Sequence, residues 1–338
     1  MNKIIPENIR DILIVRIGKI GDIIATSFVF EVIKRNNPGA NVFLLTKDTN
    51  RNILKYNTKI DGVFYLASGI KRYFQLLKLK KRRFDLIMDF NDNPSRTTRM
   101  IFSSFNADIK CGYQFELYEK FLDIKIPRPD QTKTHIIDRM AYFLNSAGFE
   151  IDTSIQKPFF YTGKEEENAV HEIIAHLKGK KIISINISAG APIRYWNASN
   201  WGSLIKLIAS LDSNFTFLLL CVKEDRIIAE EIASIAEKAE IIIPENKSFQ
   251  HFVSFIKNSY LLISPDTSAV HAAAAFNVPV LALYPDSEWN FASWSPYRVP
   301  NRAIRSSSES LNSISIDEVF NNFVELNNEI KVNGQSEI

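Results

Sequence analysis

Short apolar runs alternate with amphipathic segments of helical length along almost the whole chain. Strands are expected in the first half at residues 11–17, 41–46, 62–65 and 85–90, and in the second half at residues 181–187, 216–222, 240–243, 260–264 and 280–284. The helices expected between them cover residues 20–35, 70–81, 96–105, 135–146, 200–210, 225–238, 249–258 and 268–276. This alternation predicts parallel sheets with helices on both faces, the doubly wound form of the α/β class.

The chain is expected to divide near residue 160. A single hydrophobic core rarely keeps growing to 338 residues. The stretch 152–167 contains Pro158, Gly163 and three consecutive glutamates, which is typical of a connection between domains. We expect two Rossmann-like domains facing a central cleft, one at residues 1–160 and one at residues 161–315. A C-terminal helix and tail would occupy residues 316–338.

Composition and charge exclude several classes of protein. The 41 basic and 38 acidic residues give a net charge of only +3, which does not favour a nucleic-acid partner. Cys111 and Cys221 are far apart, so neither a disulfide framework nor a zinc site is indicated. Pro6 and Glu7 stand where a signal peptide would be apolar, and no apolar run reaches bilayer length. A cytoplasmic protein without a membrane span is expected.

The turn Arg-Ile-Gly-Lys-Ile-Gly-Asp, residues 16–22, joins the first expected strand to the first helix. In open parallel sheets ligands bind beyond the carboxyl ends of strands, where this turn lies. Its two glycines do not form the dinucleotide fingerprint. Asp22 could accept the proton of an attacking sugar hydroxyl. Equally, Asp22 could cap the helix and complement its dipole.

Two stretches of the second half could bind phosphate. In residues 264–271 a strand ends in Ser264, and Asp266 and Thr267 precede an alanine-rich helix that carries His271. The free N–H groups at such a helix start favour a diphosphate, although the same residues could serve only as a helix cap and a packed face. In residues 186–196 a turn of small residues precedes Arg194, whose guanidinium could bind phosphate or remain an exposed charge.

Together, these three stretches resemble glycosyltransferase family 9, the ADP-heptose:lipopolysaccharide heptosyltransferases. The R-x-G-x-x-G-D turn, the N-P-G-A…K-x-W-type loop and the D-T-G-x-x-H-type helix start occur in the family's order, from about Asp11 to about Pro285. The resemblance implies a GT-B fold and an inverting transfer, with the acceptor bound by the first half and the donor by the second. A lipopolysaccharide pathway implies a Gram-negative bacterium.

The resemblance also assigns roles to residues. The catalytic base falls on Asp22, and the acidic residue near the donor ribose falls on Glu224 or Asp225. The expected donor diphosphate site comprises Ser188, Arg194, Asp266, Thr267, Ser268 and His271. Expected acceptor-binding residues are Arg16, Lys19, Asn93 and Arg96, whereas Arg99 reads more naturally as an exposed helix charge. The sequence has no D-x-D motif, so a reaction without metal or cofactor is expected.

Some departures from the family pattern leave the identity of the donor sugar and its base undecided. Ser188 and Ser268 stand where the family has glycine, Arg194 replaces lysine, and residues 284–289 replace a glycine-proline turn. Another nucleotide sugar used for a surface glycan is therefore an alternative, as is a non-catalytic nucleotide-sugar binder. A nicotinamide-dependent oxidoreductase is disfavoured by the missing dinucleotide fingerprint.

Residues 71–83 combine a basic cluster with apolar and aromatic residues at helical spacing. Such a helix could lie on an anionic membrane surface, in peripheral contact with the cytoplasmic face of the inner membrane. The alternative is a helix that packs its apolar stripe on the first sheet and leaves its lysines in water.

Overall fold

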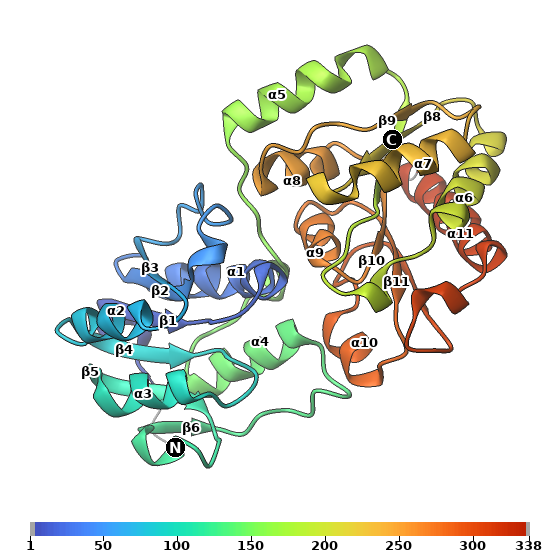
Figure 1. Cartoon of the computed structure of the whole chain (residues 1–338). Helices are drawn as coiled ribbons and strands as arrows, with labels where there is room; N and C mark the ends of the chain where they lie inside the picture. Colours follow the sequence, from blue (N-terminus) through green and yellow to red (C-terminus); the bar gives the residue numbers. More distant parts are fainter. Residues whose placement is uncertain (1–3, 336–338) are drawn as a thin grey trace. The chain divides into compact units, whose positions relative to one another are not determined.

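The computed structural model describes residues 4–335. The chain forms two compact units, Met1–Tyr161 and Thr162–Ile338, and each is a sheet covered on both faces by helices (Figure 1). Among the described residues, no helix has both the length and the apolar character needed to cross a bilayer.

The first unit contains a six-stranded parallel sheet in the order β3-β2-β1-β4-β5-β6. Its strands are β1 (Asp11–Val15), β2 (Asn41–Lys47), β3 (Gly62–Leu66), β4 (Arg83–Asp89), β5 (Asn106–Tyr113) and β6 (Ile124–Ile126). Its main helices are α1 (Ile20–Asn36), α2 (Lys71–Leu79), α3 (Arg96–Ser104) and α4 (Ile136–Ala147). One face of the sheet packs with Leu76 of α2 and Ile101 of α3, while α1 and α4 pack together.

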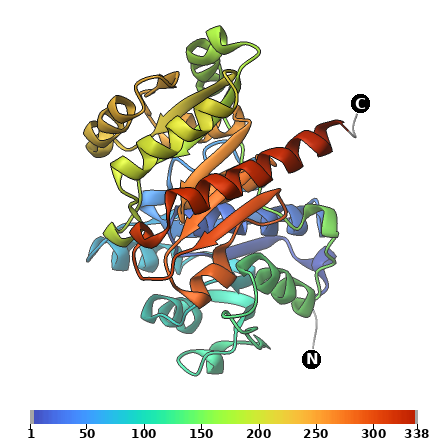
Figure 2. The ribbon, with the colours of Figure 1, turned by 90° about the vertical axis from the view of Figure 1, so that its right-hand side faces the viewer.

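The second unit repeats this topology, with the order β12-β11-β10-β7-β8-β9. Its strands are β7 (Lys181–Asn186), β8 (Phe215–Leu220), β9 (Ile241–Ile242), β10 (Leu261–Pro265), β11 (Val280–Tyr284) and β12 (Asn301–Arg305). Its helices are α5 (Lys164–Ile174), α6 (Ala198–Leu211), α7 (Arg226–Ile235), α8 (Phe249–Lys257), α9 (Ser268–Ala275), α10 (Glu288–Trp294) and α11 (Ile316–Gln335). Trp201 of α6 and Phe323 of α11 share one core with β7, and Figure 2 shows both helices crossing in front of this sheet.

Each sheet reverses its strand order at one point. The reversal lies between β1 and β4 in the first unit, where Val15 pairs with Asp89, and between β7 and β10 in the second. Side chains that follow these strands are placed where doubly wound sheets bind ligands. The two stretches that follow β1 and β4, and the two that follow β7 and β10, are therefore the first places to look for a site.

The structure confirms the two doubly wound sheets and most of the expected elements. Sequence patterning missed β5, β6, β12, α5 and α10. β5 and β12 carry several polar side chains, and β6 has three residues, so none of them has a clear apolar run. The stretch expected to be a linker contains a short 3-10 helix at Thr153–Ile155, and α5 begins at Lys164 with the glutamate run in its first turn. Carboxylates favour that position because they complement the helix dipole.

Candidate active site

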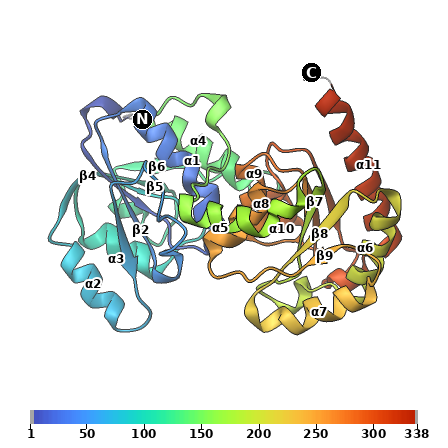
Figure 3. The ribbon, with the colours of Figure 1, turned by 90° about the horizontal axis from the view of Figure 1, so that it is seen from above.

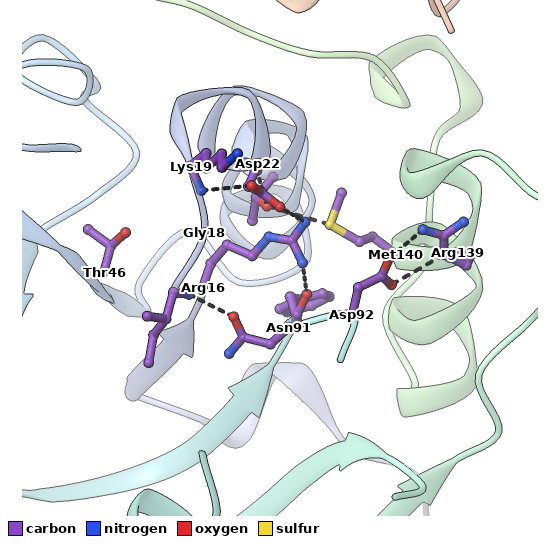
Figure 4. Close-up of polar contacts among 12 residues, drawn as sticks. Arg16, Gly18, Lys19, Asp22, Thr46, Asn91, Asp92, Arg139 and Met140 are labelled. Carbon is purple, nitrogen blue, oxygen red and sulfur yellow. Dashed lines mark hydrogen bonds and ion pairs between the residues drawn. The ribbon is translucent and has the colours of Figure 1, made fainter. Parts of the chain in front are cut away.

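Asp22 lies in the first turn of α1 with both carboxylate oxygens engaged (Figure 4). Its Oδ2 accepts a hydrogen bond from the backbone N–H of Lys19 at 2.7 Å, and its Oδ1 accepts one from Arg16 Nη2 at 2.7 Å. The side chain nevertheless remains 24% exposed. A carboxylate offers about four lone-pair sites, so Asp22 can cap the helix and still accept a proton from a bound hydroxyl.

Gly18 makes room for this carboxylate. A Cβ atom at position 18 would lie 2.4 Å from Asp22 Cβ and 2.7 Å from Asp22 Oδ2, which is closer than real Cβ atoms approach their neighbours. The backbone carbonyl of Gly18 in turn accepts a hydrogen bond from Asn50 Nδ2 at 3.1 Å. The first glycine of the turn is therefore needed for the position of Asp22.

Arg16 points inward rather than toward solvent. Its side chain is 1% exposed, and its Nη1 donates to the backbone carbonyl of Phe90 at the end of β4. Arg16 was expected to bind the acceptor, but this geometry makes it a support for Asp22. Of the other residues expected to bind the acceptor, Lys19, Asn93 and Arg96 are exposed and accessible to a ligand.

A buried carboxylate that the sequence reading did not single out holds the neighbouring loop. Asp89 Oδ1 accepts from the backbone N–H of Asn91 at 3.0 Å and from Asn91 Nδ2 at 2.5 Å, and its Oδ2 accepts from the Tyr118 hydroxyl at 3.2 Å. Asn91 Oδ1 then accepts from the backbone N–H of Ile17 at 2.8 Å. Burial raises the pKa of Asp89 to about 7 in spite of these hydrogen bonds. Asp89 could have been singled out from the sequence, because it is an acidic residue inside the apolar run 84–90.

The loop after β4 is also anchored from α4. Arg139 is fully buried and forms an ion pair with Asp92, with its Nε 3.3 Å from Asp92 Oδ1 (Figure 4). The Asp92 carbonyl accepts from Arg128 Nη1 at 2.6 Å. These contacts fix the backbone that presents Asn93. An arginine within the otherwise apolar face of α4 could have indicated a buried partner.

In the second unit Asn186 links the two stretches that follow β7 and β10. Its Nδ2 lies 3.1 Å from the Ser188 carbonyl, 3.0 Å from Ser264 Oγ and 3.1 Å from Thr267 Oγ1. Ser188 Oγ accepts from the Val222 N–H at 3.0 Å, so this serine also joins the turn after β8. The structure thus brings into contact the two stretches that the sequence indicated as possible phosphate sites.

Arg194 and Asp266 form the charged centre of this edge. Arg194 Nη1 lies 3.0 Å from the Asp266 carbonyl and 3.2 Å from Asp266 Oδ2. The same Oδ2 accepts from Asn290 Nδ2, in α10, at 2.7 Å. Because a carboxylate repels phosphate, Asp266 is better suited to orienting Arg194 than to binding a diphosphate directly. Asn290 was missed because the sequence pattern did not predict α10, the helix that carries it.

The start of α9 carries the remaining residues expected near the diphosphate. Thr267 caps the helix, with its Oγ1 accepting from the Ala269 N–H at 3.2 Å, and Ser268 follows as a partly exposed residue. His271 is buried, and its ring packs edge-on against Trp294 of α10 at a centroid distance of 5.5 Å. Thr267 and Ser268 are thus the more accessible members of this group.

The two candidates for the donor ribose differ in their exposure to solvent. Asp225 is buried, and its Oδ2 accepts from the Tyr195 hydroxyl at 3.0 Å. Burial, followed by this hydrogen-bonded carboxylate, raises the pKa of Tyr195. Glu224 is exposed and makes no ion pair within residues 4–335. Glu224 is therefore the carboxylate that is available to a ribose hydroxyl.

A family model and individual known proteins match most of this chain, and they agree on the same family. The family model for glycosyltransferase family 9 (heptosyltransferase) matches residues 70–323, which is more than half of the chain. The putative lipopolysaccharide heptosyltransferase 4 of Escherichia coli (strain K12) is 23% identical over 290 residues, covering 83% of this chain and 76% of that protein.

Two solved structures share the fold. A family 9 glycosyl transferase from Veillonella parvula superimposes with a TM-score of 0.81 at 18% identity, covering 96% of this chain and 99% of the other. Heptosyltransferase WaaC of E. coli, solved with ADP, gives a TM-score of 0.73 at 15% identity, covering 94% and 99%. These likenesses confirm the GT-B architecture expected from the sequence.

Proposed function

The chain belongs to glycosyltransferase family 9, the heptosyltransferase family, and on this premise we propose that it transfers a heptose from ADP-heptose to the core of a lipopolysaccharide or lipooligosaccharide. The first unit would bind the acceptor and the second unit the donor. The observation that carries the proposal is the Asp22 carboxylate, which is held by the Lys19 amide and Arg16 yet partly exposed beside the switch point of its sheet.

In the proposed reaction, Asp22 takes the proton of an acceptor hydroxyl while that oxygen attacks the anomeric carbon of the donor. The bond from the anomeric carbon to the diphosphate breaks, ADP departs, and the configuration inverts. One base positioned in this way typically accelerates such a step about 10²- to 10⁴-fold. Lys19, Asn93 and Arg96 would contact the anionic groups of the acceptor.

The developing charge on the diphosphate would be stabilised by the second unit. Arg194, oriented by Asp266 and Asn290, offers a guanidinium to the phosphate oxygens. The first turn of α9, around Thr267 and Ser268, offers N–H groups. Glu224 would accept from a ribose hydroxyl. With these donors the reaction is proposed to need no metal ion.

A different nucleotide sugar is the second candidate function. It is favoured by residues 284–289, which stand where the family has a glycine-proline turn and which lead directly to Asn290, a partner of Asp266. Ser188 and Ser268 also replace glycines near the expected diphosphate.

Because the acceptor is proposed to be a lipid-linked glycan, the enzyme is proposed to act in the cytoplasm in peripheral contact with the inner membrane.

A thermal-shift comparison of ADP, UDP and GDP tests the donor. A ligand that binds only the native state, at about one hundred times its Kd, stabilises that state by about 2.7 kcal/mol. ADP is expected to raise the melting temperature most, in line with the ADP present in the E. coli WaaC structure. A shift with UDP or GDP and none with ADP would exclude the ADP-heptose donor and leave the second candidate. No shift with any of the three would contradict the ADP-heptose donor and would exclude UDP and GDP sugars from the second candidate.

A further inference from the structure

Helix α2 carries apolar side chains on two of its sides. Leu76 and Leu79 are buried in the core of the first unit. In contrast, Tyr73, Phe74 and Leu77 are 59%, 66% and 60% exposed, and Ile70 at the N-cap is 72% exposed. The alternative in which the apolar stripe simply packs on the sheet therefore accounts for Leu76 and Leu79 only.

The four exposed side chains lie on one face of the helix. Positions 70, 73, 74 and 77 have the spacing i, i+3, i+4 and i+7, which places side chains next to one another on a helix surface. α2 lies at the periphery of its unit (Figure 3). We call these four residues, together with Lys71 and Lys78, the α2 surface. Scattered exposed apolar residues need no explanation, but a contiguous stripe of this kind indicates a binding surface.

Basic side chains surround the stripe. Residues 62–84 contain seven lysines and arginines and no aspartate or glutamate. Lys71 and Lys78 stand three residues before and four residues after Phe74, so they flank it on the helix. Arg82 and Arg83 are engaged with Asp11 and Asp108, at 3.8 and 2.5 Å. Within residues 4–335, Lys71, Lys78, Lys80 and Lys81 form no ion pair.

We propose that the α2 surface docks onto an anionic lipid bilayer, with Phe74 and Leu77 entering the interface and Lys71 and Lys78 contacting lipid headgroups. Aromatic and leucine side chains flanked by lysines are the features that bind such interfaces. A second copy of the chain would bring the same positive charges together and be repelled. This proposal identifies the surface behind the peripheral contact named above, and it does not depend on the donor or on turnover.

Vesicle flotation tests the proposal with the full-length protein. Binding is measured to vesicles of phosphatidylcholine alone and to vesicles of phosphatidylcholine mixed with phosphatidylglycerol. The wild type is expected to float only with the anionic vesicles and to bind less at high salt. Lys71→Ala combined with Lys78→Ala should weaken binding roughly 30-fold, since each lysine near an anionic surface counts for about a factor of five. Phe74→Ser combined with Leu77→Ser should weaken it about tenfold or more.

Matched controls come from exposed residues of the second unit. Lys206→Ala combined with Lys238→Ala removes the same charge, and Ile227→Ser removes an exposed apolar side chain. Neither control is expected to change flotation. Absence of binding to anionic vesicles, or equal loss in the controls and the α2 variants, would overturn the proposal. If the wild type forms a dimer that the Phe74 and Leu77 substitutions dissociate, and if it does not bind vesicles, the proposal would be overturned in favour of self-association. Nucleotide binding by each variant is followed separately, so failure of the transferase proposal would be recognised independently.

Discussion

The space into which a side chain at position 18 would project is filled by Asp22. A Cβ at Gly18 would meet Asp22 Cβ at 2.4 Å, Cγ at 2.5 Å and Oδ2 at 2.7 Å. The glycine thus has a steric reason that does not involve close approach of a ligand. It allows the carboxylate to reach the Lys19 amide and Arg16 together.

Gly18→Ala is therefore expected to displace the proposed base while leaving the fold intact. A shift of about 1 Å at a reacting group can lower the rate about 10²-fold, and we expect kcat to fall by that order with little change in the melting temperature. Gly39→Ala is the matched control, because a Cβ there would meet only Asn37 Oδ1 at an ordinary 3.5 Å. Unchanged kcat in Gly18→Ala would show that the position of Asp22 is not critical.

The raised pKa of Asp89 predicts that the stability of the fold depends on pH. Burial raises its pKa from 3.8 to about 7, so the native state holds a proton that the unfolded state releases between these values. The stabilising contribution is complete below 3.8 and is lost as the pH rises through about 7. Urea denaturation at several pH values should show the free energy of unfolding of the wild type falling, relative to that of Asp89→Asn, across this window.

Glu237→Gln, which removes an exposed carboxylate, serves as the control for the Asp89 experiment. Its unfolding free energy should follow that of the wild type at every pH. If the profiles of Asp89→Asn and the wild type run parallel, the buried carboxylate does not titrate in this range.

Arg194 is expected to matter through its positive charge and through its orientation by Asp266. Arg194→Ala should lower kcat/KM for the donor about 10²- to 10³-fold, the usual effect of removing one preorganised group that stabilises charge. Arg194→Lys keeps the charge and should lose about tenfold or less. Asn290→Ala removes the 2.7 Å partner of Asp266 and should fall between the two.

The control for these variants is Arg302→Ala, which breaks ion pairs with Glu325 and Glu329 instead. Partly exposed pairs of this kind contribute about 1 kcal/mol or less, so its kinetics should match those of the wild type. Wild-type kinetics in Arg194→Ala would remove Arg194 from the donor site.

Chelation tests the proposed absence of a metal requirement. Turnover measured with and without excess EDTA should be the same, because Arg194 and the N–H groups of α9 are proposed to carry the charge that a divalent ion would otherwise neutralise. Loss of activity on chelation, with recovery on adding magnesium or manganese, would contradict this part of the mechanism.

Local patterns predicted the regular elements well, because buried strands such as β1, from Ile12 onward, and β11 are uninterrupted apolar runs. They failed at β5 and β12, where polar side chains break the pattern and pairing with a neighbouring strand supplies the order. Motif resemblance singled out Asp22 and Arg194 as candidates but gave no information on the contacts that orient them. Asp22 is oriented from within its own turn, by Lys19 and Arg16. Arg194, in contrast, is oriented by Asp266 and Asn290, which are distant in sequence and meet only in the folded chain.

The position of Arg16 also could not be predicted from the sequence. Arg16 was expected to bind the acceptor, whereas the fold buries it between Asp22 and the end of β4. Exposure also separates Glu224 from its neighbour Asp225, which the sequence could not do.

Transfer from ADP-heptose to a heptose-deficient lipopolysaccharide core, read by mass spectrometry with wild type beside Asp22→Asn, tests the proposed reaction and the proposed base together. Asparagine keeps the size of the side chain and can still accept one of the two hydrogen bonds from Lys19 and Arg16, but it cannot take the proton. The wild type is expected to add one heptose, and the variant is expected to lose about 10²- to 10⁴-fold in rate with its ADP-induced thermal shift intact. Full activity in Asp22→Asn, or no heptose transfer by a wild type that binds ADP, would contradict the account.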